Sequence, residues 1–244
     1  MPIAQLEPLI APGLTLEDAI ADVRAAAALR LERSRLAVEL IEQRFPEARS
    51  AVTSQGERAL AGQLVLPGTG GKPAFVGDPP DWFANPNGDS EYLWLLNRMP
   101  QWEDLRRAWL LTGDERFRGA IIAQMLDWVA RCPSPDLSRP FSDIHPIATG
   151  VHPWRALEVG IRMFSHWRRA FDVILAGGPV ERATESALLL CLHRHGEFLA
   201  LIPPQLWPKA DHNHFLMESP GAAECRPTGA GLRRIAALAG RGAA

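Results

Sequence analysis

The chain has little of what marks several common classes of protein. Its 244 residues include only three cysteines, Cys132, Cys191 and Cys225, which are widely spaced. This argues against a disulfide framework, so we expect buried or incidental thiols. The sequence lacks a basic N-terminal segment followed by an apolar run, and it lacks an unbroken stretch of about 18 apolar residues. As given, it therefore predicts a cytoplasmic protein with neither a secretory signal nor a membrane span.

Sequence signals for nucleotides, cofactors and nucleic acids are also missing. The formal net charge is −2, so no basic surface for a nucleic acid or a membrane is indicated. There is no GxSxG elbow and no GxGxxG turn after a strand, and the glycines at 68, 70 and 71 are followed by Lys72-Pro73 instead of the Lys-Ser or Lys-Thr of a phosphate loop. We therefore expect no cofactor.

What the chain does have is a core-forming composition rich in tryptophan. Hydrophobic residues make up 47% and charged residues 22%, which predicts a folded core. Eight tryptophans stand against one tyrosine. Tryptophan suits both helix packing and stacking on sugars, so the tryptophans are compatible with either role.

Apolar spacing predicts a mainly helical chain. The expected helices are 15–45, 90–98, 101–111, 115–131, 153–175 and 180–202. Residues 46–90 are rich in glycine and proline and are predicted to be loops or short extended pieces, a connecting arm to the main helical body. Helix pairs joined by short turns indicate an all-α fold, and repeated helical hairpins fit an α/α toroid as well as a bundle or solenoid.

The histidines define the candidate site, because all seven follow residue 144. His193 and His195 are two apart and cannot share a helix face, so they are not expected to bind a metal together. The stretch from Asp211 to Glu218 leaves three alternatives open. In extended backbone, His212 and His214 could bind zinc near Asp211, although no third ligand is evident. Asp211 or Asn213 could instead cap a helix starting at 214. The stretch could also form a catalytic or sugar-binding cluster.

Three stretches together resemble the N-terminal domain of the heparinase II/III-like polysaccharide lyases, which include alginate lyase relatives. They are Trp94-Leu95-Leu96-Asn97-Arg98 followed by Trp102 and Thr112-Gly113-Asp114, then the Trp154–Arg162 stretch with its W-x-x-L-E-x-G-x-R pattern, and Asn213-His214-Phe215-Leu216-Met217-Glu218. Each is weak alone, but their order and spacing are fairly specific. The resemblance covers roughly residues 80–219.

The resemblance implies an incomplete α/α toroid, followed in the family by a β-sandwich, and β-elimination on polysaccharides containing uronic acid, such as heparan sulfate or alginate. It implies that Asn213 neutralises the substrate carboxylate and that His214 is the adjacent donor or base. Glu218 would support them, while Trp94, Asn97, Arg98 and His212 would bind the anionic polysaccharide without any metal. Structural bonding between helices is an equally good reading of Asn97 and Arg98.

The sequence also departs from the family. His212 replaces the first Asn of the family's N-N-H, the family's catalytic tyrosine lies on a downstream segment that this chain lacks, and Tyr92 is too far upstream to replace it. No β-sandwich segment follows. From Pro220 glycine, alanine and arginine dominate, which suggests a frameshift or premature stop.

We therefore predict an N-terminal helix and arm (1–80), a toroid portion (81–219) and an atypical tail (220–244), forming a fragment with an incomplete active site. Relatives in the family are often periplasmic or secreted, unlike the location that this sequence predicts. Two other functions stay open. One is a non-catalytic glycan-binding module with a tryptophan-lined cleft, and the other is a metal-dependent hydrolase built on His212 and His214.

Overall fold

Helices form nearly all of the regular structure in the computed structural model, which describes residues 2–10, 12–86 and 88–224. The helical elements are α1 (Pro2–Leu6), η1 (Glu7–Leu9), α2 (Leu16–Arg44), α3 (Ala48–Leu60), α4 (Ser90–Leu96), α5 (Pro100–Thr112), α6 (Glu115–Arg131), α7 (Phe141–Thr149), α8 (Ala156–Arg162), η2 (Met163–Trp167), α9 (Arg168–Ala176), α10 (Arg182–Leu201), α11 (Pro203–Leu206) and α12 (Asn213–Glu224). Strands β1 (Gln63–Leu64) and β2 (Ala74–Phe75) pair antiparallel. The all-α prediction is confirmed.

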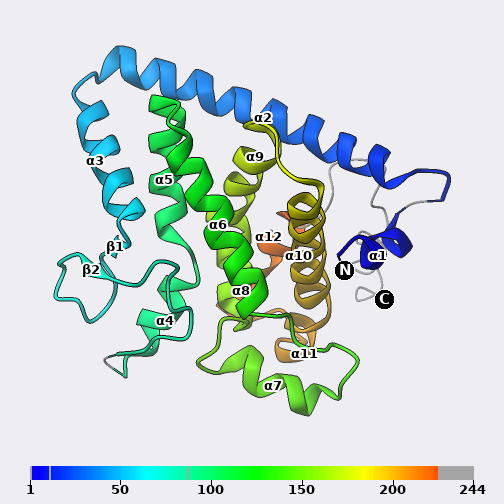
Figure 1. The fold of residues 1–244 in the computed structure, drawn as a ribbon. Coiled ribbons are helices and arrows are strands. Elements are labelled where there is room, and N and C mark those ends of the chain that lie inside the picture. The colour runs from blue at the N-terminus through cyan, green and yellow to red at the C-terminus, as the bar shows by residue number, and fades with distance from the viewer. Residues whose placement is uncertain (1, 11, 87, 225–244) are drawn as a thin grey trace.

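The long helix α2 lies across one end of α3, α5, α9 and α10 (Figure 1). It begins at a capping box, because the Thr15 hydroxyl accepts a bond from the Asp18 N–H while the Asp18 carboxylate accepts one from the Thr15 N–H. Arg30 in α2 donates hydrogen bonds of 2.8–3.1 Å to the carboxylate of Asp172 in α9. These contacts fix α2 on the helices beneath it. Within the described part of the chain, no helix is long and apolar enough to cross a membrane.

The prediction that residues 46–90 contain no helix is wrong for Ala48–Leu60. This helix, α3, packs on α5 through small residues, and a Cβ added at Gly56 would lie 2.3 Å from the Ala108 Cβ. Such a contact depends on close backbone approach, which leaves no periodic pattern of large apolar side chains in the sequence. The core is continuous across residue 80, since Val76 and Trp82 belong to one cluster.

Other elements also differ from the prediction. Helices α7 and α11 lie outside the predicted helices, in segments where several prolines obscure the helical pattern. The helix predicted from residue 153 begins at Ala156, because Arg155 is extended and the Trp154 N–H is held by His152 Nδ1 at 3.0 Å. Its middle turn is the π-helical η2.

Six of the eight tryptophans are buried in the core, and the three at 128, 154 and 167 surround Arg162. Arg162 is fully buried, donates to His195 Nε2 and bonds to the Pro153 carbonyl. Cation–π contact with indoles is favourable in such a desolvated place. Packing therefore explains most of the tryptophan content, and only Trp94 and Trp207 are partly exposed.

Candidate functional site

The candidate site is built around the start of α12. The His212 side chain caps this helix, because its Nδ1 accepts the His214 N–H at 3.2 Å. The helix begins at Asn213 instead of His214, so neither Asp211 nor Asn213, the caps considered as one alternative from the sequence, is the residue that precedes it. It continues through Pro220 to Glu224, so the pattern change at residue 220 does not end the helix. The rest of the predicted tail, including Cys225, lies outside the described residues.

Two rings fix the orientation of His214. His212 stacks on Trp207 with a centroid distance of 3.9 Å and an interplanar angle of 8°. The His214 ring stands edge-on to both, at 4.6 Å from His212 and 5.4 Å from Trp207. Because Trp207 comes from the loop after α11, this loop and the start of α12 form one packed aromatic unit.

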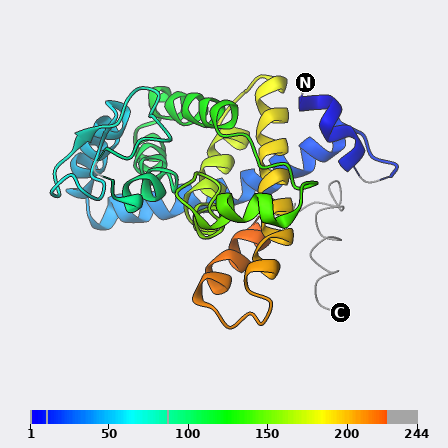
Figure 2. The same cartoon turned by 90° about the horizontal axis from the view of Figure 1, so that it is seen from below.

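Two glycines let α12 lie directly against α8. A Cβ at Gly160 would be 2.6 Å from the Glu218 Cα, and a Cβ at Gly221 would be 2.5 Å from the Gly160 carbonyl oxygen. Only glycine allows backbones to approach this closely. Helices α11 and α12 project together on one side of the molecule (Figure 2). The glycine contact therefore places Glu218 against α8.

A cavity of about 210 Å³ brings Arg155, Trp207, His214 and Glu218 together. The Glu218 side chain is 1% exposed, and neither carboxylate oxygen has a hydrogen-bond partner among the described residues. Burial raises the pKa of Glu218 to about 7. The Trp207 indole and the charge of Arg155 oppose this rise, although no hydrogen bond of ordinary geometry joins Trp207 to the carboxylate. An unsatisfied buried carboxyl is a candidate partner for a ligand.

His214 is held in its neutral form near pH 7. Partial burial lowers the pKa of His214, and the charges of His212 and Arg155 lower it further, against a smaller effect of Glu158. A neutral imidazole can accept a proton at one nitrogen and donate a hydrogen bond from the other. The site therefore has a possible base beside a carboxyl that is partly protonated.

Arg155 connects this cavity to Arg98 and Trp94. Its guanidinium lies 3.8 Å over the Trp94 ring and donates to Glu158 at 2.7 Å. The fully buried Glu158 also accepts two bonds from Arg98. Trp94 and Arg98 are thus linked to His214 and Glu218 through Arg155 and Glu158. Sequence reasoning did not select Arg155, Glu158 or Trp207, although Arg155 and Glu158 stand inside the W-x-x-L-E-x-G-x-R pattern.

Asn97 and Asn213 have contrasting places. Asn97 is fully buried, donates to the carbonyls of Trp82 and Leu93 at 2.8 and 2.9 Å, and accepts the Trp128 indole N–H at 2.8 Å. It joins helices in the core, as the structural reading expected, and does not line the cavity. Asn213 is exposed at the first residue of α12, and its amide makes no hydrogen bond to a described residue.

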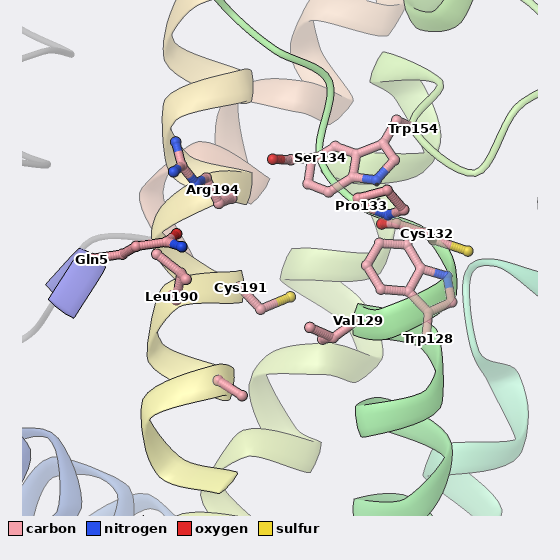
Figure 3. Close-up of a pocket in the computed structure, with 11 residues that line it drawn as sticks. Gln5, Trp128, Val129, Cys132, Pro133, Ser134, Trp154, Leu190, Cys191 and Arg194 are labelled. Atoms are coloured by element: carbon pink, nitrogen blue, oxygen red, sulfur yellow. Dashed lines mark hydrogen bonds between the residues drawn. The ribbon is translucent and has the colours of Figure 1, made fainter. Parts of the chain in front are cut away.

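A second cavity, of about 250 Å³, has a different character (Figure 3). The Trp128 and Trp154 rings lie on one side of it, and Leu190 and Arg194 lie on the other. Burial raises the pKa of both Cys132 and Cys191 to about 12, so neither thiol is a nucleophile. Both cysteines are buried and free, which confirms the expectation for these two.

Replacing Glu218 by glutamine should stabilise the protein above pH 7. The folded-state pKa of about 7 lies above the ordinary 4.5, so native stability is greatest in acid and falls as pH rises from about 4.5 through 7. Glutamine cannot ionise and removes this loss, which amounts to about 2–3 kcal/mol. Urea unfolding at pH 5 and pH 8 measures the effect, with exposed Glu91→Gln as control. A Glu218→Gln stability difference equal at both pH values would contradict the prediction.

The fold and the site define an all-α protein in which an imidazole, a carboxyl and a guanidinium share one cavity. The sequence matches the heparinase II/III N-terminus family over residues 24–225, so the chain belongs to this family. No curated protein matches the chain.

Solved structures show a similar fold. Heparan sulfate lyase HepC from Pedobacter heparinus is 20% identical with a TM-score of 0.61, and the match covers 99% of this chain and 38% of that one. A heparinase III is 18% identical with a TM-score of 0.58, covering 79% of this chain and 30% of that one. The chain thus spans well under half the length of these structures, and at such identities they bear on the fold alone.

Proposed function

We propose that the chain acts in β-elimination on a polysaccharide containing uronic acid, of the heparan sulfate or alginate type. The observation that carries this proposal is that His214, kept neutral, shares a cavity with Arg155 and Glu218 at the start of α12. Family membership supports the reaction class, and the names of the solved neighbours, a heparan sulfate lyase and a heparinase III, support a polyanionic substrate.

The chemistry assigns roles to Asn213, His214 and Glu218. The C5 proton of a uronate becomes acidic enough to remove only when hydrogen-bond donors neutralise the neighbouring carboxylate and stabilise the charge that develops. The exposed amide of Asn213 supplies such donors. Neutral His214 takes the C5 proton, the C4–O4 bond breaks, and a double bond forms between C4 and C5 as O4 leaves with a proton from an acid. Glu218 lies one turn after His214 and supports it.

An absorbance assay tests the proposal. The purified protein is mixed in turn with alginate, heparan sulfate and hyaluronan, and the ultraviolet absorbance of unsaturated uronates is followed with and without a chelator. We expect product from at least one substrate, at the same rate in both conditions. Glycan binding without product would contradict the proposal and favour the binding module, and loss of activity with the chelator would favour the metal-dependent hydrolase.

The geometry gives these alternatives less support. A tryptophan-lined cleft would have to use Trp94 and Trp207, because the other six tryptophans are buried. For a metal, the described part of the chain holds no group of three or more His, Cys, Asp or Glu side chains placed to bind one ion. His212 and His214 would therefore lack a third protein ligand from these residues.

A further inference from the structure

A cavity of about 490 Å³ lies between α2, α3, α5 and α9, away from the residues described above. Figure 1 shows how α2 crosses the ends of α3, α5 and α9. Four arginines line the cavity, namely Arg33, Arg106, Arg107 and Arg169, together with Glu103 and an apolar wall that includes Val38, Ile41 and Leu111. It has no lining residue in common with the cavity at His214. Neither the family resemblance nor the proposed reaction assigns it a role.

The one carboxylate in the lining is already fully engaged. Glu103 is 7% exposed and accepts bonds from Arg106 at 2.7 and 2.8 Å and from Arg107 at 2.8 Å, with Arg169 at 3.6 Å. Burial alone would raise the pKa of Glu103, but bonds from Arg106 and the charges of the three arginines hold it below its ordinary value. Glu103 is therefore ionised and holds Arg106, Arg107 and Arg169 near one another.

Positive charge remains in excess. Three arginines share Glu103, and Arg33 makes no ion pair with a described residue, so four guanidiniums face one carboxylate. The buried carboxylate of Asp172 on α9 forms an ion pair with Arg30. Asp104 on α5 does not line the cavity; burial raises its pKa, and the charge of Arg107 opposes this rise. Like charges gathered in a partly enclosed space repel, and a bound anion would relieve this repulsion.

We propose that this cavity binds an oxyanion, a sulfate or carboxylate group carried by an anionic glycan chain. Arginine recognises both groups through paired N–H donors. The side chains of Arg107 and Arg169 are 51% and 56% exposed and can turn toward a ligand, while Arg106, at 11%, stays on Glu103. The wall of Val38, Ile41 and Leu111 offers apolar surface to the C–H faces of sugar rings. The inference that an oxyanion binds rests on this cavity alone. The inference that a glycan carries this oxyanion rests on the proposed function.

Calorimetric titration of the whole chain tests this site. The probes are a heparan sulfate oligosaccharide and inorganic sulfate, and the variant is Arg107→Gln with Arg169→Gln. The matched control removes two positive charges elsewhere, with Arg116→Gln and Arg182→Gln, whose side chains are 60% and 42% exposed. We expect oligosaccharide affinity to fall about 10–100-fold in the first variant, since each good charged contact is worth about tenfold or more, and to change less than about twofold in the control. Arg33→Glu, an exposed change on α2, tests the same site without touching Glu103.

The outcomes separate this proposal from the proposed function. Unchanged affinity in both cavity variants, or an equal loss in the control, would overturn the site. If inorganic sulfate binds as strongly as the oligosaccharide, the inference that a glycan carries the oxyanion would be overturned. His214→Ala should keep the affinity for this cavity while losing product, so a failure of β-elimination leaves this test intact.

Discussion

Replacement of His214 by alanine is expected to lower the rate of β-elimination by about 10²–10⁴-fold, the usual contribution of a positioned acid or base. The ring is partly exposed and the backbone N–H that joins it to His212 remains, so the fold should survive. Initial rates from unsaturated-uronate absorbance give the effect, and circular dichroism checks the fold.

The pH profile distinguishes a base from a merely structural ring. Burial and the charges of His212 and Arg155 hold the pKa of His214 below its ordinary value, so the rate should rise with pH and level off at a lower pH than an exposed imidazole would give. His145→Ala, an exposed histidine on α7, is the matched control and should leave rate and profile unchanged. Full activity in His214→Ala, or an equal loss in His145→Ala, would contradict the assignment.

The sequence predicts those helices whose packing uses large apolar residues. Phe117, Ile121, Met125 and Trp128 mark α6 at helical spacing, and all four are buried. Helix α3 escapes because it packs through small residues, with Gly56 against the Ala108 methyl group, and such a contact leaves no pattern of large apolar residues in the sequence. Apolar periodicity in a sequence marks helices that bury large side chains. It misses helices that pack closely through small residues.

The site shows the same division between local and long-range information. His212, His214 and Glu218 are neighbours in sequence, so a local motif is enough to find them. Trp207 and Arg155 reach them only because the loop after α11 folds back and α8 meets α12 at Gly160 and Gly221. Asn97 stands beside Arg98 in the motif, directly after α4 ends, yet its amide bonds within the core while Arg98 bonds to Glu158. Adjacent motif residues therefore need not share a function.

Glu158→Ala is expected to lower the free energy of unfolding by about 3–5 kcal/mol, because removing one partner of a buried ion pair leaves the other charge uncompensated. Glu158 is fully buried between Arg98 and Arg155, whose side chains are 22% and 15% exposed. Without its carboxylate both guanidiniums lose their main acceptor while they remain largely buried. Denaturant unfolding followed by tryptophan fluorescence measures the loss.

Two variants separate charge from volume. Glu158→Gln keeps the side-chain volume and should lose most of the same stability, because the missing charge, and not a cavity, is the cause. Glu91→Ala removes the other carboxylate near Arg98, at 3.9 Å and 54% exposed, and should cost less than about 1 kcal/mol as exposed pairs do. A small loss in Glu158→Gln would show that Glu158 acts by packing. A large one would mean that the ion pair which stabilises α8 also holds Arg155 at the cavity of His214, so that stability and site geometry depend on the same carboxylate.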